Sequence, residues 1–278
     1  MVWRERARKT MIKKEVTENG LVADLFTDAS VQPRKTIIML GGSEGGKSWS
    51  RIKRPIEVLV QRGYSVLSLA YFRSQGLPRS LEEIPLEYFE KAFDWLSTRT
   101  GIVPNEYAIL GGSKGAEVAL LLGSKYPQVK AVIAFSPSCV VWQGIPANRF
   151  EIGKEVKSSW SCKGKSVPFL PYPSSIKKLD LLLLRLGKMH KEALRNTKRV
   201  REATIQVENI QGAILLISGE RDRLWPATAM SEQIMSRLTA KGFDHPYEHI
   251  AYNTGHNGIV MNRDCWRKIF DFLQEHYI

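Results

Sequence analysis

Residues 107–117 have the sequence YAILGGSKGAE, in which an apolar run leads into Gly-x-Ser-x-Gly and then into residues that favour a helix. A serine in this pattern, between a strand and a helix, occupies a sharp turn that exposes its hydroxyl at the edge of a sheet. The glycines beside it remove side chains that would clash in such a turn. A glycine-rich loop without a catalytic role is the alternative, but the strand before it and the helix after it favour Ser113 as a nucleophile.

Segments typical of strands and helices alternate on both sides of this turn. The first two strands are separated by Asn19-Gly20, which is typical of a hairpin. The alternation predicts an α/β fold, in which a mostly parallel sheet carries helices on both faces and begins with an antiparallel hairpin. The expected strands are residues 11–16, 21–26, 36–40, 64–70, 107–110, 129–134, 211–218 and 247–250, and the expected helices are residues 50–62, 86–98, 116–125, 230–241 and 266–275.

One long segment, residues 140–208, interrupts this alternation. It is too long for a connection within a compact sheet, and it contains Pro168, Pro171 and Pro173 followed by an amphipathic helical stretch. A lid inserted between two strands is the most economical interpretation. The sequence therefore predicts a core formed by residues 1–139 and 209–278, with an inserted basic lid at residues 140–208.

Positive charge is concentrated in this insertion. The chain of 278 residues has a formal net charge of +13, and residues 139–209 hold 14 Lys and Arg against 6 Asp and Glu. Such a balance favours an anionic partner, namely nucleic acid, a lipid surface or a phosphorylated small molecule, and a solvated basic surface is an equal alternative. Residues 179–186 could line an acyl tunnel or pack a lid helix onto the core. The candidate phosphate-binding lysines are Lys154, Lys157, Lys163, Lys165, Lys177 and Lys178.

An acid and a base for Ser113 follow it along the chain. In folds of this kind the nucleophile comes first, an Asp or Glu second and a histidine third. Asp222 follows the apolar run at residues 214–218, and His256 follows the next strand in the sequence Gly-His-Asn-Gly. Because active-site groups of open α/β sheets gather at the carboxyl ends of the strands, we expect Ser113, Asp222 and His256 to meet there.

Other residues of the same types are weaker candidates. Glu220 lies two residues nearer the strand than Asp222, and Asp244 lies further away. A lone aspartate in a turn usually caps the backbone, so the position of Asp222 between Ser113 and His256 is what favours it. The remaining histidines do not follow a strand; they are His190, His245, His249 and His276.

Acyl transfer also requires hydrogen-bond donors for the oxyanion of the tetrahedral intermediate. The backbone N–H of Lys114, directly after the nucleophile, is the first expected donor. The second should come from the loop after the strand at residues 36–40, where four glycines in Gly41–Gly46 let the backbone approach a substrate. We expect the N–H of Ser43 to be this donor, with Gly42 as the next choice.

The same loop also fits the nucleotide-binding pattern Gly-x-x-x-x-Gly-Lys-Ser at residues 41–48. In that motif the lysine contacts phosphates and the serine holds Mg²⁺. Pro55 early in the next helix argues against it, and so does the lack of a suitable metal-binding aspartate at the end of an apolar strand. A nucleotide-binding protein would also leave Ser113 and His256 without a role, so it is the least favoured alternative.

Cysteines and apolar segments limit the class of protein further. Cys139, Cys162 and Cys265 are widely spaced and predict neither a disulfide framework nor a zinc site, and we expect no metal and no cofactor. Residues 1–14 lack the apolar centre of a secretory signal. No apolar stretch approaches the ~20 residues of a membrane helix. We therefore expect a cytoplasmic protein without stable membrane insertion.

Four stretches together indicate a resemblance to a known family: GGSKGAE at residues 111–117, YPQVKAVI at 126–133, ISGERDRLWP at 217–226 and TGH at 254–256. Through them residues 11–278 resemble the C-terminal α/β-hydrolase domain of the acyl-CoA thioesterase and bile acid-CoA:amino acid N-acyltransferase family. The resemblance implies an α/β-hydrolase fold, a Ser113–Asp222–His256 triad and cleavage of an acyl-CoA thioester.

Two features distinguish this sequence from parts of that family. The stretch before Thr36 is short, so we expect no counterpart of the additional N-terminal β-domain of the animal members. The acyltransferase members use cysteine as nucleophile, and Ser113 in that place implies hydrolysis by water.

The sequence therefore predicts a serine hydrolase that cleaves an acyl thioester through an acyl-enzyme. A carboxylesterase or a dienelactone-type hydrolase with the same triad is the alternative. The expected partner is a small-molecule acyl ester or acyl-CoA, with no nucleic acid, and the oligomeric state stays open.

Overall fold

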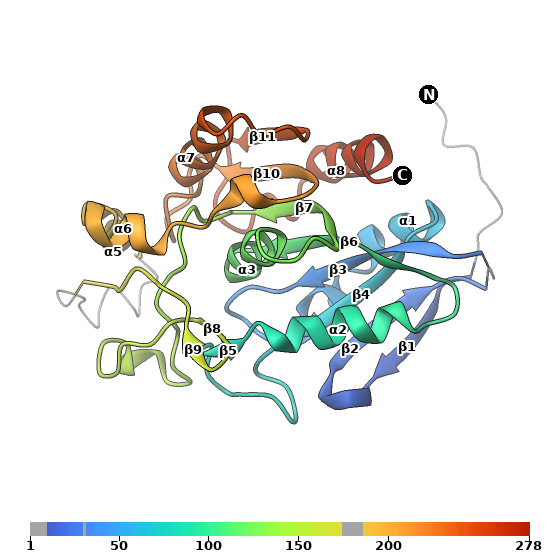
Figure 1. The fold of residues 1–278 in the computed structure, drawn as a ribbon. Coiled ribbons are helices and arrows are strands. Elements are labelled where there is room, and N and C mark those ends of the chain that lie inside the picture. The colour runs from blue at the N-terminus through green and yellow to red at the C-terminus, as the bar shows by residue number, and fades with distance from the viewer. Residues whose placement is uncertain (1–9, 30–31, 174–185) are drawn as a thin grey trace.

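The structure, a computed structural model, describes residues 10–29, 32–173 and 186–278 (Figure 1). Within these ranges, an eight-stranded sheet has the strand order β1-β2-β4-β3-β6-β7-β10-β11. The pairs β1–β2 and β2–β4 are antiparallel, and every later pair of the sheet is parallel. The strands are β1 (Ile12–Val16), β2 (Val22–Thr27), β3 (Arg34–Leu40), β4 (Ser65–Ala70), β6 (Ile102–Gly112), β7 (Val129–Phe135), β10 (Ala213–Gly219) and β11 (Tyr247–Tyr252).

Helices cover both faces of this sheet (Figure 1). Helices α1 (Lys53–Gln61) and α8 (Arg263–His276) pack in the core of one face. Helices α2 (Glu87–Ser97), α3 (Lys114–Gly123) and α7 (Ala227–Ala240) pack in the core of the other. Every residue of α3 is buried. A helix covered on all sides needs apolar residues all round, which explains its run of Ala, Val and Leu.

The burial of each strand follows its position in the sheet. The central strands β3, β7 and β10 are buried almost throughout and consist of near-continuous apolar residues, as parallel strands covered on both faces require. The edge strand β1 is exposed at four of its five residues and carries Lys13, Lys14 and Glu15. Charges on an edge strand discourage pairing with another chain.

The expected α/β fold, with its antiparallel hairpin and mostly parallel sheet, is therefore confirmed. The helix expected at residues 50–62 is divided into a 3₁₀ turn, η2 (Ser48–Arg51), and α1. Pro55 lies in the first turn of α1, where its missing N–H costs no helical hydrogen bond. Strand β6 begins at Ile102 rather than at residue 107, because Ile102 pairs with Arg34 of β3 across a shift in register.

The segment between β7 and β10 packs onto the core face of α2 and α3. Trp142, Trp160 and Leu170 of this segment are almost fully buried and belong to the same core as those helices. Its β8 (Trp160–Cys162) and β9 (Lys165–Ser166) form a small sheet with β5 (Ile84–Pro85), which the sequence did not predict. The segment also contains η3 (Arg149–Glu151), α5 (Gly187–Ala193), α6 (Thr197–Ala203) and η4 (Val207–Asn209), while η1 (Glu18–Gly20) lies in the hairpin.

Part of the predicted lid lies outside the described residues. Lys177, Lys178 and the leucine-rich residues 179–185 fall there, as do residues 1–9. None of the helices in the described part of the chain is long and apolar enough to cross a membrane.

Candidate active site

Ser113 lies in a strained turn between β6 and α3. Its backbone has φ 55° and ψ −116°, a conformation that few residues other than glycine adopt. Such strain persists only where the surroundings enforce it, and it is frequent at functional sites. Here the N–H of Ser113 donates to the carbonyl of Phe135 at 2.8 Å. The strand-turn-helix context expected from the sequence is therefore present.

Two glycines let the turn of Ser113 pack closely against the sheet. A Cβ at position 111 would lie 2.1 Å from the carbonyl oxygen of Gly115. A Cβ at position 115 would lie 2.2 Å from the carbonyl oxygen of Leu40 in β3. Real Cβ atoms essentially never approach backbone atoms this closely, so both positions require glycine.

Asp222 and His256 are joined directly. Nδ1 of His256 donates to Oδ2 of Asp222 at 2.6 Å, although 34 residues separate them. The other oxygen, Oδ1, accepts the N–H groups of Leu224 at 2.8 Å and Trp225 at 3.2 Å. These bonds fix the carboxylate, and a ring that donates through Nδ1 directs Nε2 away from Asp222.

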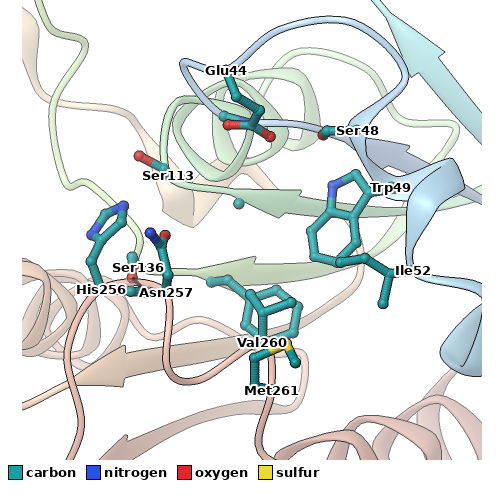
Figure 2. A pocket seen from close by; sticks show the side chains of 13 residues that line it. Glu44, Ser48, Trp49, Ile52, Ser113, Ser136, His256, Asn257, Val260 and Met261 are labelled. Atoms are coloured by element: carbon teal, nitrogen blue, oxygen red, sulfur yellow. Dashed lines mark hydrogen bonds between the residues drawn. The ribbon is translucent and has the colours of Figure 1, made fainter.

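A cavity of about 380 Å³ brings Ser113 and His256 to one site (Figure 2). Figure 2 shows these two residues on one side of the cavity and Trp49 and Ile52 on the other. No hydrogen bond joins the Ser113 hydroxyl to His256 in the part of the chain that the structure describes, so proton transfer would require these side chains to approach. The cavity is lined by Gly42, Glu44, Ser48, Trp49, Ile52, Gly112, Ser113, Phe135, Ser136, His256, Asn257, Val260 and Met261.

The walls of this cavity are mainly apolar. Trp49, Phe135 and Trp266 form an aromatic cluster beneath it, with ring centroids 5.5–6.1 Å apart. Ile52, Val260 and Met261 add aliphatic surface. Met261 is 80% exposed. An apolar surface beside a nucleophile suits the hydrocarbon part of an acyl group.

Neither of the residues expected to supply the oxyanion donors, Lys114 and Ser43, is among those that line the cavity. The backbone N–H of Lys114 is at the first position of α3, where helical N–H groups lack an intrahelical acceptor. Ser43 is exposed and is not one of the lining residues, although Gly42 and Glu44 on either side of it are. The N–H of Gly42 donates to Oε1 of Glu44 at 2.9 Å. Among the described residues no acceptor is found for the N–H of Ser43.

Glu44 is a residue of this site that the sequence analysis missed. Its carboxylate lies in the cavity beside Gly42, close to the turn of Ser113. The sequence signal was an acidic residue within an otherwise glycine-rich loop. A carboxylate that accepts the Gly42 N–H competes with any substrate oxygen for that donor.

The side chain of Lys114 is turned away from the cavity into a buried ion pair. Its Nζ lies 2.7 Å from Oε2 of Glu117, and both side chains are almost fully buried. Glu117 also accepts Nε1–H of Trp160 at 2.7 Å and the backbone N–H of Trp142 at 3.2 Å. Burial lowers the pKa of Lys114 and raises the pKa of Glu117, and the mutual attraction of the two charges opposes both shifts.

Replacing Glu117 with glutamine should destabilise the protein substantially. The variant would keep an acceptor for Trp160 but would leave the ammonium of Lys114 buried without its counter-charge. We expect the free energy of unfolding to fall by about 3–5 kcal/mol, as for other buried pairs that lose one partner. Urea unfolding followed by tryptophan fluorescence measures this change.

The double variant Lys114→Met with Glu117→Gln is the matched control. It removes both charges, so we expect it to be clearly more stable than Glu117→Gln alone. Equal destabilisation of the two variants would contradict the assignment of the loss to an unpaired buried charge.

Trp225, in the loop after β10, connects His256 to the insertion. The indole of Trp225 lies edge-on to the His256 ring, with centroids 5.9 Å apart. His190 of α5 packs against the other side of Trp225, with centroids 5.8 Å apart. Burial lowers the pKa of His190 to about 4, so this histidine is neutral near pH 7. It therefore serves as a packing residue between α5 and the candidate site.

The side chains of Lys47 and Ser48 are not arranged as the nucleotide-binding alternative for residues 41–48 would require. Nζ of Lys47 lies 2.8 Å from both Glu15 and Asp24, and these pairs hold it at the edge of the sheet. Ser48 lines the cavity of Ser113 instead. In the described ranges no group of three or more His, Cys, Asp or Glu residues is arranged to hold a metal ion.

Known proteins resemble this chain in both sequence and fold. Residues 84–259, more than half of the chain, match the family model "BAAT / Acyl-CoA thioester hydrolase C terminal". The chain is 26% identical over 232 residues to acyl-coenzyme A thioesterase 2, mitochondrial, of Mus musculus, covering 83% of this chain and 46% of that protein. It is 26% identical over 233 residues to acyl-coenzyme A amino acid N-acyltransferase 1 of Mus musculus, covering 83% and 50%.

A human relative, acyl-coenzyme A thioesterase 6 of Homo sapiens, is 28% identical over 248 residues, covering 88% of this chain and 54% of that protein. The chain thus spans about half the length of the curated relatives it matches.

Solved structures resemble the chain over nearly its whole length. A putative dienelactone hydrolase from Klebsiella pneumoniae has a TM-score of 0.62 at 14% identity, covering 95% of this chain and 98% of that one. The esterase Pf2001 of Pyrococcus furiosus has a TM-score of 0.61 at 16% identity, covering 96% and 91%. At these identities the likeness concerns the fold alone, and it confirms the expected α/β-hydrolase fold.

Proposed function

The chain belongs to the BAAT / acyl-CoA thioester hydrolase C-terminal family, and from this premise we propose that it is a serine hydrolase that cleaves an acyl thioester of the acyl-CoA type. Ser113 is the nucleophile, His256 the general base and acid, and Asp222 the residue that orients His256. The observation that carries this proposal is the 2.6 Å hydrogen bond from His256 to Asp222 beside the cavity that the strained turn of Ser113 enters.

The first half of the proposed reaction forms an acyl-enzyme. Oγ of Ser113 attacks the thioester carbonyl while Nε2 of His256 accepts its proton. The backbone N–H groups of Lys114 and Ser43 stabilise the oxyanion of the tetrahedral intermediate. When the intermediate collapses, the C–S bond breaks and His256 returns the proton to the leaving thiolate.

The second half releases the acid. A water molecule attacks the ester of Ser113, and His256 now takes a proton from this water and returns it to the Ser113 oxygen. Asp222 accepts the Nδ1–H of His256 throughout, holds the ring in the required tautomer and stabilises the imidazolium. The products are a free carboxylic acid, a free thiol and the regenerated enzyme.

The acyl chain is proposed to lie against the apolar wall of the cavity. Trp49, Ile52 and Val260 offer such a surface opposite Ser113 (Figure 2). We further propose that residues 140–208 act as a lid, with residues 1–139 and 209–278 as the core. The edge-on ring contacts of Trp225 with His190 of α5 and with His256 support a connection between this lid and the site.

A substrate panel tests the proposed reaction. Acyl-CoA thioesters and p-nitrophenyl esters of equal chain length are offered to the purified protein, and release of thiol or nitrophenol is measured. We expect kcat/KM to be at least about tenfold higher for the thioester, because the larger leaving group supplies additional binding energy. Addition of glycine should leave free acid as the product, since water is the acceptor.

Two results would contradict the proposal. A preference for the p-nitrophenyl ester would favour the carboxylesterase or dienelactone-type alternative on the same three residues. Formation of N-acylglycine in place of free acid would show that an amine, rather than water, is the acceptor.

A further inference from the structure

A second cavity, of about 580 Å³, lies next to the candidate active site. It is lined by Arg73, Ser74, Gln75, Arg79 and Ala147. The first four belong to the connection between β4 and β5, and Ala147 belongs to the insertion after β7. Its lining thus includes two arginines and two further polar residues, and no acidic residue. The cavity is therefore strongly electropositive.

The two arginines are not neutralised by neighbouring acids. In the ranges that the structure describes, neither Arg73 nor Arg79 forms an ion pair, whereas Lys154 and Lys157 of the insertion are paired with Glu151 and Glu155. The lysines that the sequence suggested for binding phosphates are thus partly engaged. Unpaired arginines are better placed, because a guanidinium presents donors in a fork that matches phosphate oxygens.

Arg73 is held in place before any ligand binds. Its backbone has φ 50°, a strained value for a residue with a side chain. Its Nη1 donates to the carbonyl of Ser43 at 3.1 Å, and its guanidinium lies 5.5 Å from the ring centroid of Phe72. A Cβ at Gly45 would lie 2.7 Å from Cβ of Arg73, so the arginine packs closely on the glycine-rich loop. Such a fixed side chain loses little entropy on binding.

The glycine-rich loop separates this cavity from that of Ser113. Gly42 and Glu44 line the first cavity, while Ser43 and Gly45 contact Arg73 of the second. A ligand with a reactive end in the first cavity and an anionic end in the second would cross this loop. A thioester of coenzyme A has this form, because an extended arm separates its sulfur from its phosphates.

Resting on the proposed function, we propose that the Arg73–Arg79 cavity binds the phosphate groups of the coenzyme A leaving group. Arg73 and Arg79 pair with phosphate oxygens, and the hydroxyl of Ser74 and the amide of Gln75 donate to the remaining oxygens. The acyl group then lies in the first cavity with its carbonyl at Ser113. This division makes the β4–β5 connection, and not the lysines of the insertion, the main determinant of specificity for the leaving group.

Direct binding of coenzyme A tests the site independently of catalysis. Calorimetric titration of the full chain with coenzyme A should give a Kd at least about tenfold higher for Arg73→Met/Arg79→Met than for the wild type. Increasing salt should weaken binding to the wild type more than to this variant, because the lost contacts are ionic. Arg201→Met, which removes one exposed arginine of α6, should bind as the wild type does.

A second measurement compares two substrates that differ in phosphate. The ratio of kcat/KM for an acyl-CoA to that for the corresponding acyl-N-acetylcysteamine, which has no phosphate, should fall at least about tenfold in Arg79→Met/Arg73→Met. The single variant Arg79→Met should lower it in the same direction, and Arg79 does not contact the glycine-rich loop through any hydrogen bond of the described residues. The ratio is insensitive to a general loss of activity.

The outcomes separate the two proposals. Equal Kd values for coenzyme A in the wild type and the double variant, or no binding by the wild type, would overturn the phosphate site. Hydrolysis of both thioesters with an unchanged ratio would overturn it as well while leaving the hydrolase intact. Failure to hydrolyse either thioester, with coenzyme A still bound through Arg73 and Arg79, would overturn the proposed reaction and retain the site.

Discussion

Ser113→Ala is expected to lower kcat for thioester hydrolysis by about 10⁴- to 10⁶-fold, because it removes the oxygen that we propose forms the acyl-enzyme. Alanine keeps the backbone of the turn and its hydrogen bond to Phe135. We therefore expect the fold to be retained and the free energy of unfolding to change by less than about 1 kcal/mol. Stopped-assay thiol release measures the rate, and urea unfolding measures the stability.

Covalent labelling identifies the nucleophile in the same variant. A fluorophosphonate probe should label the wild type and fail to label Ser113→Ala. Ser124→Ala, a serine variant at the end of α3 and outside the cavity, should label normally. Persistent labelling of Ser113→Ala would mean that another serine is the nucleophile, and the mechanism proposed above would be wrong.

Asp222→Asn should reduce kcat by about 10⁴-fold. Asparagine is nearly isosteric and can still accept the N–H groups of Leu224 and Trp225 through its carbonyl oxygen. Its amide nitrogen, however, would face Nδ1 of His256 and donate a hydrogen bond to it. The ring would then carry its proton on Nε2 and could not accept the proton of Ser113.

A matched variant separates this effect from a general loss of charge. Asp94→Asn changes an exposed aspartate of α2 in the same chemical way and should leave kcat near the wild-type value. Fluorophosphonate labelling of Asp222→Asn should be slow but specific for Ser113. If Asp222→Asn retained most of the wild-type activity, Glu220 or another acid would have to orient His256.

The main elements of the fold could be predicted from sequence because their signals are local. The central strands are continuous apolar runs, and Asn19-Gly20 marks the first hairpin. The small sheet of β5, β8 and β9 could not be predicted. Its strands have two or three residues each, and β5 pairs with β8 across more than seventy positions of the chain, so no local pattern specifies it.

For the candidate site, the proximity of Asp222 and His256 could be predicted in the same way. Asp222 and His256 follow strands that are adjacent in the sheet, and topology alone brings such residues together. The catalytic roles of Ser113, Asp222 and His256, and the oxyanion roles of Lys114 and Ser43, stay predictions. The position of Glu44 depends on how a glycine-rich loop folds over the cavity, which composition does not determine. Likewise, Lys114 and Glu117 at a spacing of three suggest a pair on a helix surface, yet burial by Trp142 and Trp160 follows only from the path of the insertion.

The buried ion pair of Lys114 and Glu117 has a consequence for exchanging segments between proteins. Glu117 is anchored by Trp160 and Trp142, so the insertion supplies part of the solvation of a charge that belongs to the core. A chimaera that carries a foreign segment between β7 and β10 would inherit this charge without its donors. Grafting should therefore succeed only when residues 114 and 117 are transplanted together with the segment that covers them.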